Sequence, residues 1–268
     1  MGEKAPRKGE LLGEGRTAEV FAWGRDRVLK LYRAEMPPEW VDHEARVSRA
    51  VYDAGVAAPA VEGVVEIDGR RGIIYERVEG PTLIQWVMAR PSRILEGGRI
   101  LADLHVAMHS REGAGLPPQV AALRHDIEYA PPLEEADRVR LLQRLDRLPT
   151  GTAVCHGDFH PDNVVLTPRG PIVLDWPQAS SGSPAADVAR TELLFKHAAL
   201  PPHLKLAQRV VIQASRRIFL AAYLRHYRSR RPLDESEVAA WMPIIAGARL
   251  NEYIPEEEAN LLRLARRS

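Results

Sequence analysis

Short apolar runs separated by turn residues dominate the first 80 positions of the chain. Runs of this length, bounded by glycine and aspartate, favour strands that pair as hairpins. The pattern predicts strands over residues 10–13, 19–23, 27–33, 61–67 and 72–78. Pro37 and Pro38 open a helix that runs to about Ala54, because proline suits the first turn of a helix and disrupts its interior. The first part of the chain is therefore expected to be a sheet interrupted by one helix.

Beyond residue 80 the apolar residues recur mostly at helical spacing. Spacings near 3.6 residues predict helices over residues 94–109, 134–148, 184–198 and 203–229. Three short apolar runs predict small strands over residues 152–155, 164–167 and 171–174. The expected fold is α+β, with two lobes and a cleft between them. Residues 1–79 would form an N-lobe with an antiparallel sheet, and residues 80–268 a larger, mainly helical C-lobe.

Composition and charge narrow the class of protein. The 268 residues suffice for one large domain or for two lobes. The 37 basic and 36 acidic residues nearly balance, which argues against a nucleic-acid or a membrane partner. No stretch has the length and apolarity of a signal peptide or a membrane span, so the expected location is cytoplasmic. Cys155 is the only cysteine, and its apolar neighbours favour a packed core residue.

The densest chemical signal is a polar segment at residues 156–163, which reads HGDFHPDN. Asp158 and Asn163 lie five residues apart on this segment, so both can face one cavity. Asp175 can reach the same place from the end of the following strand. Carboxylate and amide oxygens suit a hard cation that also binds phosphate oxygens. Phosphoryl transfer mainly needs positioning and charge neutralisation, which such side chains supply.

Two other interpretations of the polar segment are open at this point. Asp162 or Asn163 could simply cap a polar turn between strands. Alternatively, His156, Asp158, His160 and Asp162 alternate along the chain, and imidazole with carboxylate suits zinc or iron in a dinuclear hydrolase. Residues far upstream argue against a hydrolase, since it would need neither a glycine turn nor a buried lysine with a glutamate partner.

Those upstream residues resemble the parts of a nucleotide site. Gly13 and Gly15 form a G-x-G turn, which opens into a strand at Glu19. A dinucleotide-binding turn opens into a helix instead, whereas a kinase phosphate-covering hairpin continues as a strand. Lys30 is a charge inside an apolar run, and a buried lysine needs a partner. Glu44, on the next helix, is the expected partner.

In this order the motifs resemble the aminoglycoside phosphotransferase and choline kinase-like family over residues 10–190. Its signature is H-G-D, four residues, N, and then a strand that ends in D-W or D-F. The resemblance implies a protein-kinase-like fold and an ATP-dependent phosphotransferase with an alcohol group as acceptor. ATP, with GTP as an alternative donor, and Mg²⁺ are the implied cofactors. A non-catalytic nucleotide-binding module would be expected to lack some of these residues, and all are retained.

The resemblance also implies a role for each matched residue. Asp158 would accept or orient the proton of the attacking hydroxyl, and Asn163 and Asp175 would hold Mg²⁺. Lys30 and Glu44 would orient the nucleotide phosphates. The other nucleotide contacts would come from the turn glycines Gly13 and Gly15, from Val20 and Val28 on the adenine faces, and from the backbone near Glu76 and Val78.

Four further residues are expected to support the polar segment. Asp187 lies in a stretch that resembles the family's G-D-P-x-x-D-L and would anchor the segment's backbone, although an acid at a helix N-terminus also interacts favourably with the helix dipole. His156 would hold the backbone through a ring hydrogen bond. Phe159 and Trp176 would pack beneath the segment.

The acceptor is the part of the reaction that the sequence leaves open. Pro177 stands where protein kinases have glycine, and no phosphorylatable loop of kinase length follows, which argues against protein substrates. An aminoglycoside, amino sugar, choline-like alcohol, hydroxylated amino acid or sugar would fit the family. The acceptor is expected against residues 184–200 and 240–258 of the helical lobe. Candidates there are Trp241, Asn251, Glu252 and Tyr253, of which Trp241 is more typical of a core residue.

Overall fold

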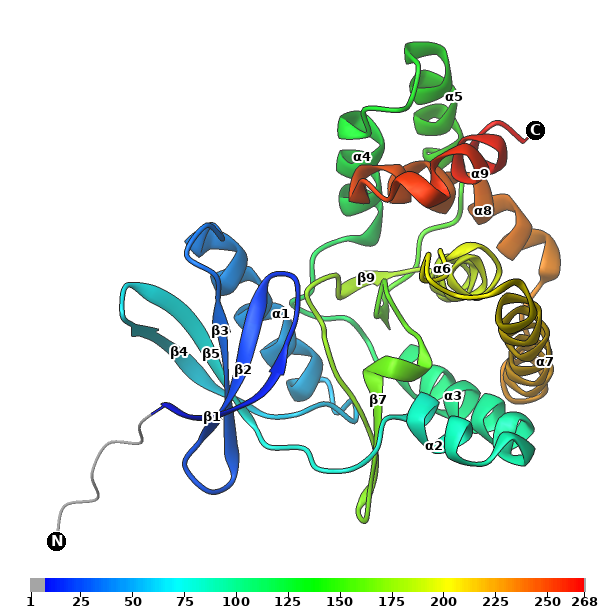
Figure 1. Cartoon of the computed structure of the whole chain (residues 1–268). Coiled ribbons are helices and arrows are strands. Elements are labelled where there is room, and N and C mark those ends of the chain that lie inside the picture. The colour runs from blue at the N-terminus through cyan, green and yellow to red at the C-terminus, as the bar shows by residue number, and fades with distance from the viewer. Residues whose placement is uncertain (1–7, 268) are drawn as a thin grey trace, which may run out of the picture.

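A five-stranded antiparallel sheet with one helix forms the start of the fold (Figure 1). The computed structural model describes residues 8–267, so the first residues of the predicted N-lobe and Ser268 lie outside the described residues. The strands are β1 (Lys8–Glu14), β2 (Ala18–Trp23), β3 (Arg27–Tyr32), β4 (Val61–Ile67) and β5 (Arg70–Glu76), in the order β1-β2-β3-β5-β4. Helix α1 (Pro38–Asp53) joins β3 to β4 and packs against β4 and β5. We call this part the N-lobe.

The turn between β4 and β5 follows directly from the sequence. Asp68 and Gly69 have φ angles of 52° and 72°, which the tight two-residue hairpin turn requires. The aspartate–glycine pair therefore forms the tight turn between these two predicted strands.

Helices dominate the remainder, which we call the C-lobe. They are α2 (Leu83–Ala89), α3 (Ile94–His109), α4 (Gln119–Tyr129), α5 (Glu135–Leu145), α6 (Pro184–His197), α7 (Leu206–Arg230), α8 (Glu235–Arg249) and α9 (Pro255–Ala265). Short 3-10 turns are η1 (Pro91–Arg93), η2 (Pro161–Asn163) and η3 (Leu250–Glu252). The C-lobe also contains two small two-stranded sheets. One pairs β6 (Ala153–Cys155) with β9 (Ser180–Gly182), and the other pairs β7 (Val164–Thr167) with β8 (Gly170–Val173).

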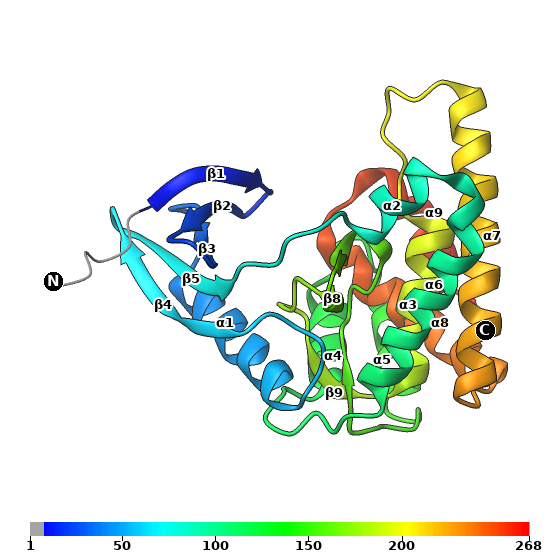
Figure 2. The ribbon, with the colours of Figure 1, turned by 90° about the horizontal axis from the view of Figure 1, so that it is seen from below.

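An extended segment, residues 77–82, connects β5 to α2, and α3 lies along α7 at the far side of the C-lobe (Figure 2). The main hydrophobic core fills the C-lobe between these helices, α6 and α8. Phe159, Trp176 and Trp241 are among its fully buried side chains, as their predicted packing roles require. Cys155 is buried as well, and burial raises the pKa of its thiol well above the usual value.

Most predicted elements are present within a few residues of their expected ends, and α3 and β7 match at both ends. No range was predicted for α2, α4, α8, α9 or β9. Within residues 8–267, no helix combines the length and the apolar character that crossing a bilayer would need.

Candidate active site

One face of α6 holds the polar segment, which lies between β6 and β7. The Asp187 carboxylate accepts hydrogen bonds from the backbone N–H of His156 at 2.7 Å and of Gly157 at 2.9 Å. One turn further along α6, the Thr191 hydroxyl donates to the backbone carbonyl of Phe159 at 3.0 Å. The predicted contact between Asp187 and the backbone of the polar segment is therefore confirmed.

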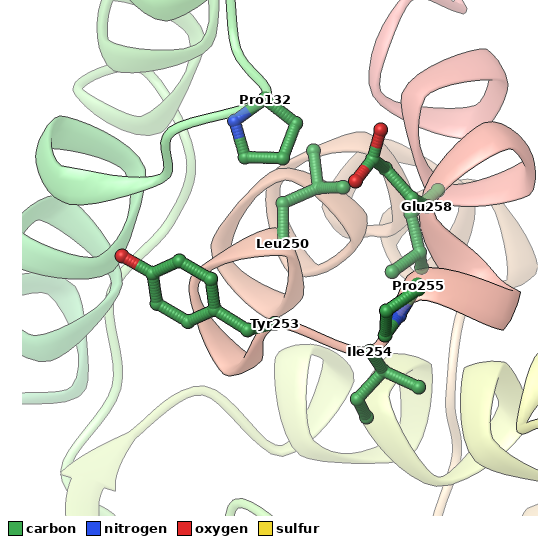
Figure 3. A pocket seen from close by; sticks show the side chains of 7 residues that line it. Pro132, Leu250, Tyr253, Ile254, Pro255 and Glu258 are labelled. Carbon is green, nitrogen blue, oxygen red and sulfur yellow. The ribbon is translucent and has the colours of Figure 1, made fainter.

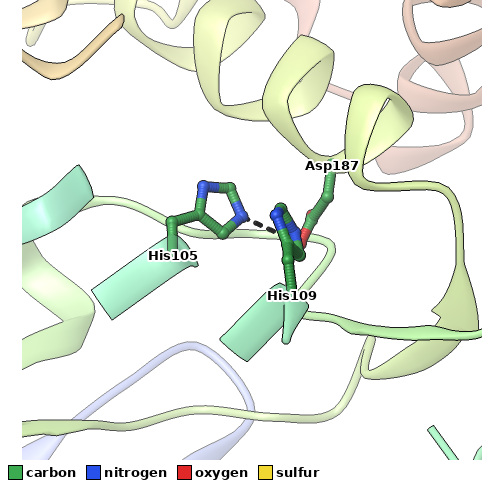
Figure 4. A group of neighbouring side chains, drawn as sticks. All are labelled: His105, His109 and Asp187. Atoms are coloured by element: carbon green, nitrogen blue, oxygen red, sulfur yellow. Dashed lines mark hydrogen bonds and ion pairs between the residues drawn. The ribbon is translucent and has the colours of Figure 1, made fainter. Parts of the chain in front are cut away.

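Two histidines of α3 support Asp187 from the interior (Figure 4). The Nε2 atoms of His105 and His109 face the same Asp187 oxygen at 3.1 and 3.3 Å. Their Nδ1 atoms face the hydroxyl groups of Tyr223 and Tyr227 on α7, at 2.6 and 2.7 Å. Each imidazole can thus accept a hydrogen bond at Nδ1 from a tyrosine hydroxyl and donate a hydrogen bond from Nε2 to the carboxylate. This arrangement requires a neutral ring protonated at Nε2. This network satisfies the charge of Asp187 although its side chain is fully buried.

His156 joins the polar segment to the strand end that carries Asp175. Its Nε2 donates to the backbone carbonyl of Leu174 at 3.0 Å, and its Nδ1 accepts from the backbone N–H of Asp158 at 3.2 Å. The predicted ring hydrogen bond is therefore present. Because Leu174 precedes Asp175, one buried imidazole fixes the backbone beside both acids.

Asp158 lies at the surface of this framework, with its side chain 33% exposed. Arg190 of α6 forms an ion pair with its Oδ1 at 3.4 Å, and His160 Nε2 lies 3.5 Å from its Oδ2. Partial burial raises the pKa of Asp158, but the hydrogen bond from His160 and the charge of Arg190 outweigh burial, so the pKa is well below its usual value. The side-chain nitrogen of Asn163 donates to the backbone carbonyl of Asp158 at 3.1 Å, so these two predicted residues lie together.

Lys30 connects the N-lobe to the C-lobe. Its Nζ donates to Glu44 Oε1 at 2.7 Å, the contact predicted from the sequence, and to Asp175 Oδ1 at 2.9 Å, which was not predicted. Tyr32 and Tyr75 also donate to the Glu44 carboxylate, which fixes its position. Burial lowers the pKa of Lys30, but the carboxylates of Glu44 and Asp175 outweigh this effect and raise it, so the lysine is charged.

Asp175 itself has a φ angle of 64°, in the left-handed region that non-glycine residues seldom occupy. Such conformations persist where surrounding structure holds them, and they concentrate at functional sites. The side chain is 49% exposed, so the carboxylate remains accessible beyond its contact with Lys30.

Both valines predicted to contact adenine lie on the same sheet face as Lys30. Val20 of β2 is directly opposite Lys30 of β3, and Val28 precedes Lys30 by two residues on the same strand. Directly opposed residues, and residues two apart on one strand, point to the same side of a sheet. Gly13 lies in β1 and Gly15 begins the turn into β2, whose first residue accepts from the Gly15 N–H at 2.8 Å. The predicted hairpin, rather than a helix, therefore follows the glycines.

At the other end of this sheet, Glu76 is the last residue of β5 and Val78 lies two residues beyond it, at the start of the connecting segment. The Glu76 side chain pairs with Arg169, which follows β7, at 2.7 Å. Its side chain is thus engaged across the lobes, and the backbone is the part that would meet adenine.

The alternating acids and histidines of the polar segment do not gather as a metal cluster. His156 points into the C-lobe, away from the exposed side of Asp158 and Asp162. Among residues 8–267 the one group with converging metal-ligand atoms is His105, His109 and Asp187. None of these three residues belongs to the polar segment, and the Asp187 carboxylate already faces four hydrogen-bond donors, namely two backbone N–H groups and the two imidazoles. The geometry therefore favours the phosphotransfer interpretation over the hydrolase.

The candidates for the acceptor wall have different surroundings. Asn251 donates to Asp126 of α4 at 3.0 Å, and burial raises the pKa of Asp126. Glu252 is paired with arginines, whereas Tyr253 is 69% exposed. Tyr253 lines a cavity of about 80 Å³ with Pro132, Leu250, Ile254, Pro255, Glu258 and Leu261 (Figure 3). Ligand pockets usually measure about 300–1,000 Å³, so this cavity is too small for an acceptor.

A sequence model of the phosphotransferase enzyme family matches residues 8–235, which is most of the chain. The chain belongs to this family. The family predicted from the motifs is thereby confirmed, and the protein is a phosphotransferase.

Three known proteins show how far the likeness of this phosphotransferase extends. The EKC/KEOPS complex subunit BUD32 of Yarrowia lipolytica is 22% identical over 215 residues, or 75% of this chain and 79% of that protein. An aminoglycoside 3'-phosphotransferase of type VIII superposes with a TM-score of 0.60 at 18% identity and covers 92% of this chain and 94% of its own. Amicoumacin kinase hAmiN, solved with AMP-PNP, Ca²⁺ and Ami, gives 0.58 at 13% identity, with 96% and 86% covered. These two structures confirm the predicted α+β, protein-kinase-like fold.

Arg190 of this phosphotransferase was not predicted as a site residue. The sequence spacing could have indicated this residue. Arg190 follows Asp187 by three residues, and this spacing places both side chains on one helix face. An arginine one turn after the anchoring acid was therefore positioned to reach the same loop.

The buried histidines make the stability of this phosphotransferase depend on pH. Burial, and then the neighbouring His109, lower the pKa of His105 to about 3, and burial lowers that of His109. In an unfolded chain the histidine pKa is about 6.5. Below that value the unfolded state binds protons that the folded state does not bind. The free energy of unfolding should therefore fall as the pH drops below about 6.5, and His105 alone should contribute up to about 1.4 kcal/mol per pH unit down to about pH 3.

Urea unfolding at pH 7, 6, 5 and 4 measures this dependence. His105→Gln should make the slope shallower, whereas His203→Gln, a change at an exposed histidine, should leave it as it is. Equal slopes in the original protein and in His105→Gln would contradict burial of a neutral imidazole. The other titratable groups that face His105 are Asp187, Tyr223 and His156, and Asp187 keeps its charge in this range because its hydrogen bonds hold its pKa well below the usual value.

Proposed function

We propose that this phosphotransferase is a small-molecule kinase that transfers the terminal phosphate of ATP to a hydroxyl group. The observation that carries the proposal is the pair of ion pairs at Lys30, which reaches Glu44 on its own lobe and Asp175 on the other. A lysine held in this way presents a fixed positive charge where the lobes meet. Fixed charge is what phosphoryl transfer chiefly requires of a protein.

In this proposal the N-lobe, residues 1–79, covers the nucleotide, and the C-lobe, residues 80–268, supplies the acid, the metal ligands and the acceptor wall. The shared sheet face of Val20, Val28 and Lys30 supports this placement, because adenine on the valines leaves the phosphates near the lysine. The backbone near Glu76 and Val78 would then bond the adenine edge, and Gly13 and Gly15 would cover the phosphates. GTP would fit the same phosphate contacts.

Asn163 and Asp175 fit a Mg²⁺ ion by their chemistry. The Asn163 amide nitrogen is engaged with Asp158, which leaves its oxygen for a cation, and Asp175 keeps an accessible carboxylate. Oxygen ligands of this kind are the ones that Mg²⁺ prefers. The ion would supply charge neutralisation at the phosphates. Amicoumacin kinase hAmiN, with the same fold, binds AMP-PNP and Ca²⁺, which supports nucleotide with a divalent cation here.

Asp158 would orient the acceptor hydroxyl and take its proton. Its carboxylate is exposed on one side and held on the other by Arg190, so a hydroxyl can approach only from the exposed side. Aminoglycosides, amino sugars, choline-like alcohols, hydroxylated amino acids and sugars are the acceptors to be tried. A screen of ATP consumption with Mg²⁺ against such compounds, with the product identified by its mass, tests the function. If no compound and no nucleotide is consumed, the proposed function is wrong.

The metal assignment makes a separate prediction. Asp175→Asn should weaken Mg²⁺-dependent ATP binding by about 10- to 100-fold or more. A loss of about 10- to 100-fold is typical when a residue that only supports a metal ligand is changed. Asparagine is the suitable replacement, because it tolerates the positive φ angle at this position better than alanine does. Asn163→Ala should have a smaller effect, since no charge is lost.

Calorimetric titration of ATP with and without Mg²⁺ measures both effects. Asp162→Asn removes a charge from an exposed acid next to Asn163 and serves as the control. ATP affinity that is unchanged in Asp175→Asn, with Mg²⁺ present, would contradict the metal role.

A further inference from the structure

A row of alternating charges leads from Asp158 to the last helix. Arg190 pairs with both Asp158 and Glu252 through one nitrogen, Nη2. The other oxygen of Glu252 accepts from Arg249 at 2.9 Å, and Arg249 in turn pairs with Glu257 at 2.6 Å. The row therefore crosses from the polar segment through α6, η3 and α8 to α9.

The inner members of this row are shielded from water. The side chain of Arg190 is 8% exposed, and Arg249 and Glu257 are similarly buried. A buried arginine between two carboxylates has little freedom to move, because its planar group loses its partners when it rotates. Asp158, by contrast, has a short side chain that is partly exposed. Arg190 is thus the rigid partner and Asp158 the one that is held.

The geometry of Arg190 is not the one that would satisfy its own hydrogen bonds best. Its Nε is buried and has no hydrogen-bond partner among residues 8–267. An unpartnered buried donor is unfavourable for stability. Such a departure is expected where a side chain serves a site rather than the packing of the fold.

We infer that Arg190 is a positioning residue for Asp158, and that Glu252 fixes Arg190 in place. The inference rests on the proposed function, because it assigns Arg190 a role through the acid that takes the acceptor proton. Arg190 is buried, so its assigned role is to act through Asp158. Three side chains of α6 therefore hold consecutive parts of the polar segment. Asp187 binds the backbone before Asp158, Arg190 binds the Asp158 side chain, and Thr191 binds the backbone after it.

Glu252 has a second consequence for the acceptor wall. Both of its oxygens are occupied by arginines, so its charge is neutralised within the protein. It is therefore a structural partner of Arg190 and not a free anion for a cationic acceptor. Through Glu252 the row ties the predicted acceptor wall to the side chain that takes the proton.

Two variants test the positioning role. Arg190→Lys keeps the charge but lacks the planar group. The double variant Arg190→Met with Glu252→Leu removes both partners, so that no unpaired charge stays buried. Misplacement of a reacting group by about 1 Å can lower turnover by about 100-fold. We expect kcat to fall by about tenfold in the first variant and by about 100-fold in the second, with the KM for ATP within about twofold.

The matched control is Arg266→Met with Asp137→Leu, which removes an ion pair between α9 and α5 whose acid is 8% exposed and whose printed partners are not members of the row. Turnover of ATP is measured with streptomycin, choline, D-glucosamine and L-homoserine, and with water alone as acceptor. The acceptor that the unmodified protein uses fastest is the one compared. Urea unfolding confirms that each protein is folded. The control should lose stability and keep kcat within about threefold, as expected of a pair that only packs.

The outcomes separate the inference from the proposed function. A folded Arg190 double variant with unchanged kcat, or a control pair that loses kcat equally, would overturn the positioning role. If the unmodified protein consumes ATP with none of the acceptors, water included, the proposed function itself fails and the inference with it. A loss of kcat confined to the Arg190 variants, with partial recovery in Arg190→Lys, supports it.

Discussion

Asp158→Asn is expected to lower turnover by about 100- to 10,000-fold, the range over which a positioned base contributes. Asparagine has the same shape and can still accept a hydrogen bond from Arg190, so the fold and the loop should persist. What is lost is the charge that, in the proposed function, takes the proton of the acceptor. ATP affinity should change by less than about threefold, because Lys30, Glu44 and Asp175 are untouched.

Steady-state turnover and ATP titration on the same preparation check this pair of expectations. Asp162→Asn makes the same chemical change four residues away, at a side chain that is 64% exposed and lies 3.8 Å from the Nδ1 atom of His160. It should retain turnover within about threefold. Near-normal turnover in a folded Asp158→Asn protein would remove Asp158 from the mechanism.

Asp187→Ala is expected to lower the free energy of unfolding by about 3–5 kcal/mol, the loss typical when one partner of a buried charged network is removed. Four donors face this carboxylate: two backbone N–H groups of the polar segment and the two imidazoles of α3. Alanine leaves all of them buried without an acceptor. Turnover should also fall in the protein that remains folded, because the polar segment loses its anchor.

Urea unfolding followed by circular dichroism measures the change. Glu192→Ala is the control on the same helix, since Glu192 pairs with Lys196 one turn away and such pairs contribute about 0.2–0.5 kcal/mol. If Asp187→Ala lowers the free energy of unfolding by less than about 1 kcal/mol, the network does not have the importance assigned to it.

The periodicity of apolar residues predicted those elements whose own pattern is strong. The ends of α3 and the β4–β5 hairpin follow from spacing and from one turn pair. Helix α4 was overlooked because only Gln119 and Ile127 of its eleven residues are buried, so it has almost no apolar stripe. Helix α2 was overlooked although Thr82 and Gln85 form a capping box. With seven residues it has too few turns for an apolar repeat to strengthen that signal.

The site residues also differ in how well local sequence patterns predict their contacts. Residues that one loop carries, such as Asp158 and Asn163, could be predicted because their separation along the chain fixes their separation in space. Lys30 and Glu44 lie 14 residues apart on adjacent elements, so their contact was also within reach. The contact of Lys30 with Asp175 spans 145 residues and depends on how the lobes meet, which no local pattern reports.

The residue-by-residue match between α6 and the polar segment sets limits on how this protein can diversify. Inserting or deleting a single residue between His156 and Phe159 would displace every contact beyond that point from Asp187, Arg190 and Thr191 at once. Length changes in this loop should therefore be absent from any library selected for activity. The turn between α4 and α5 makes none of these contacts, so length changes there would leave the polar segment in place.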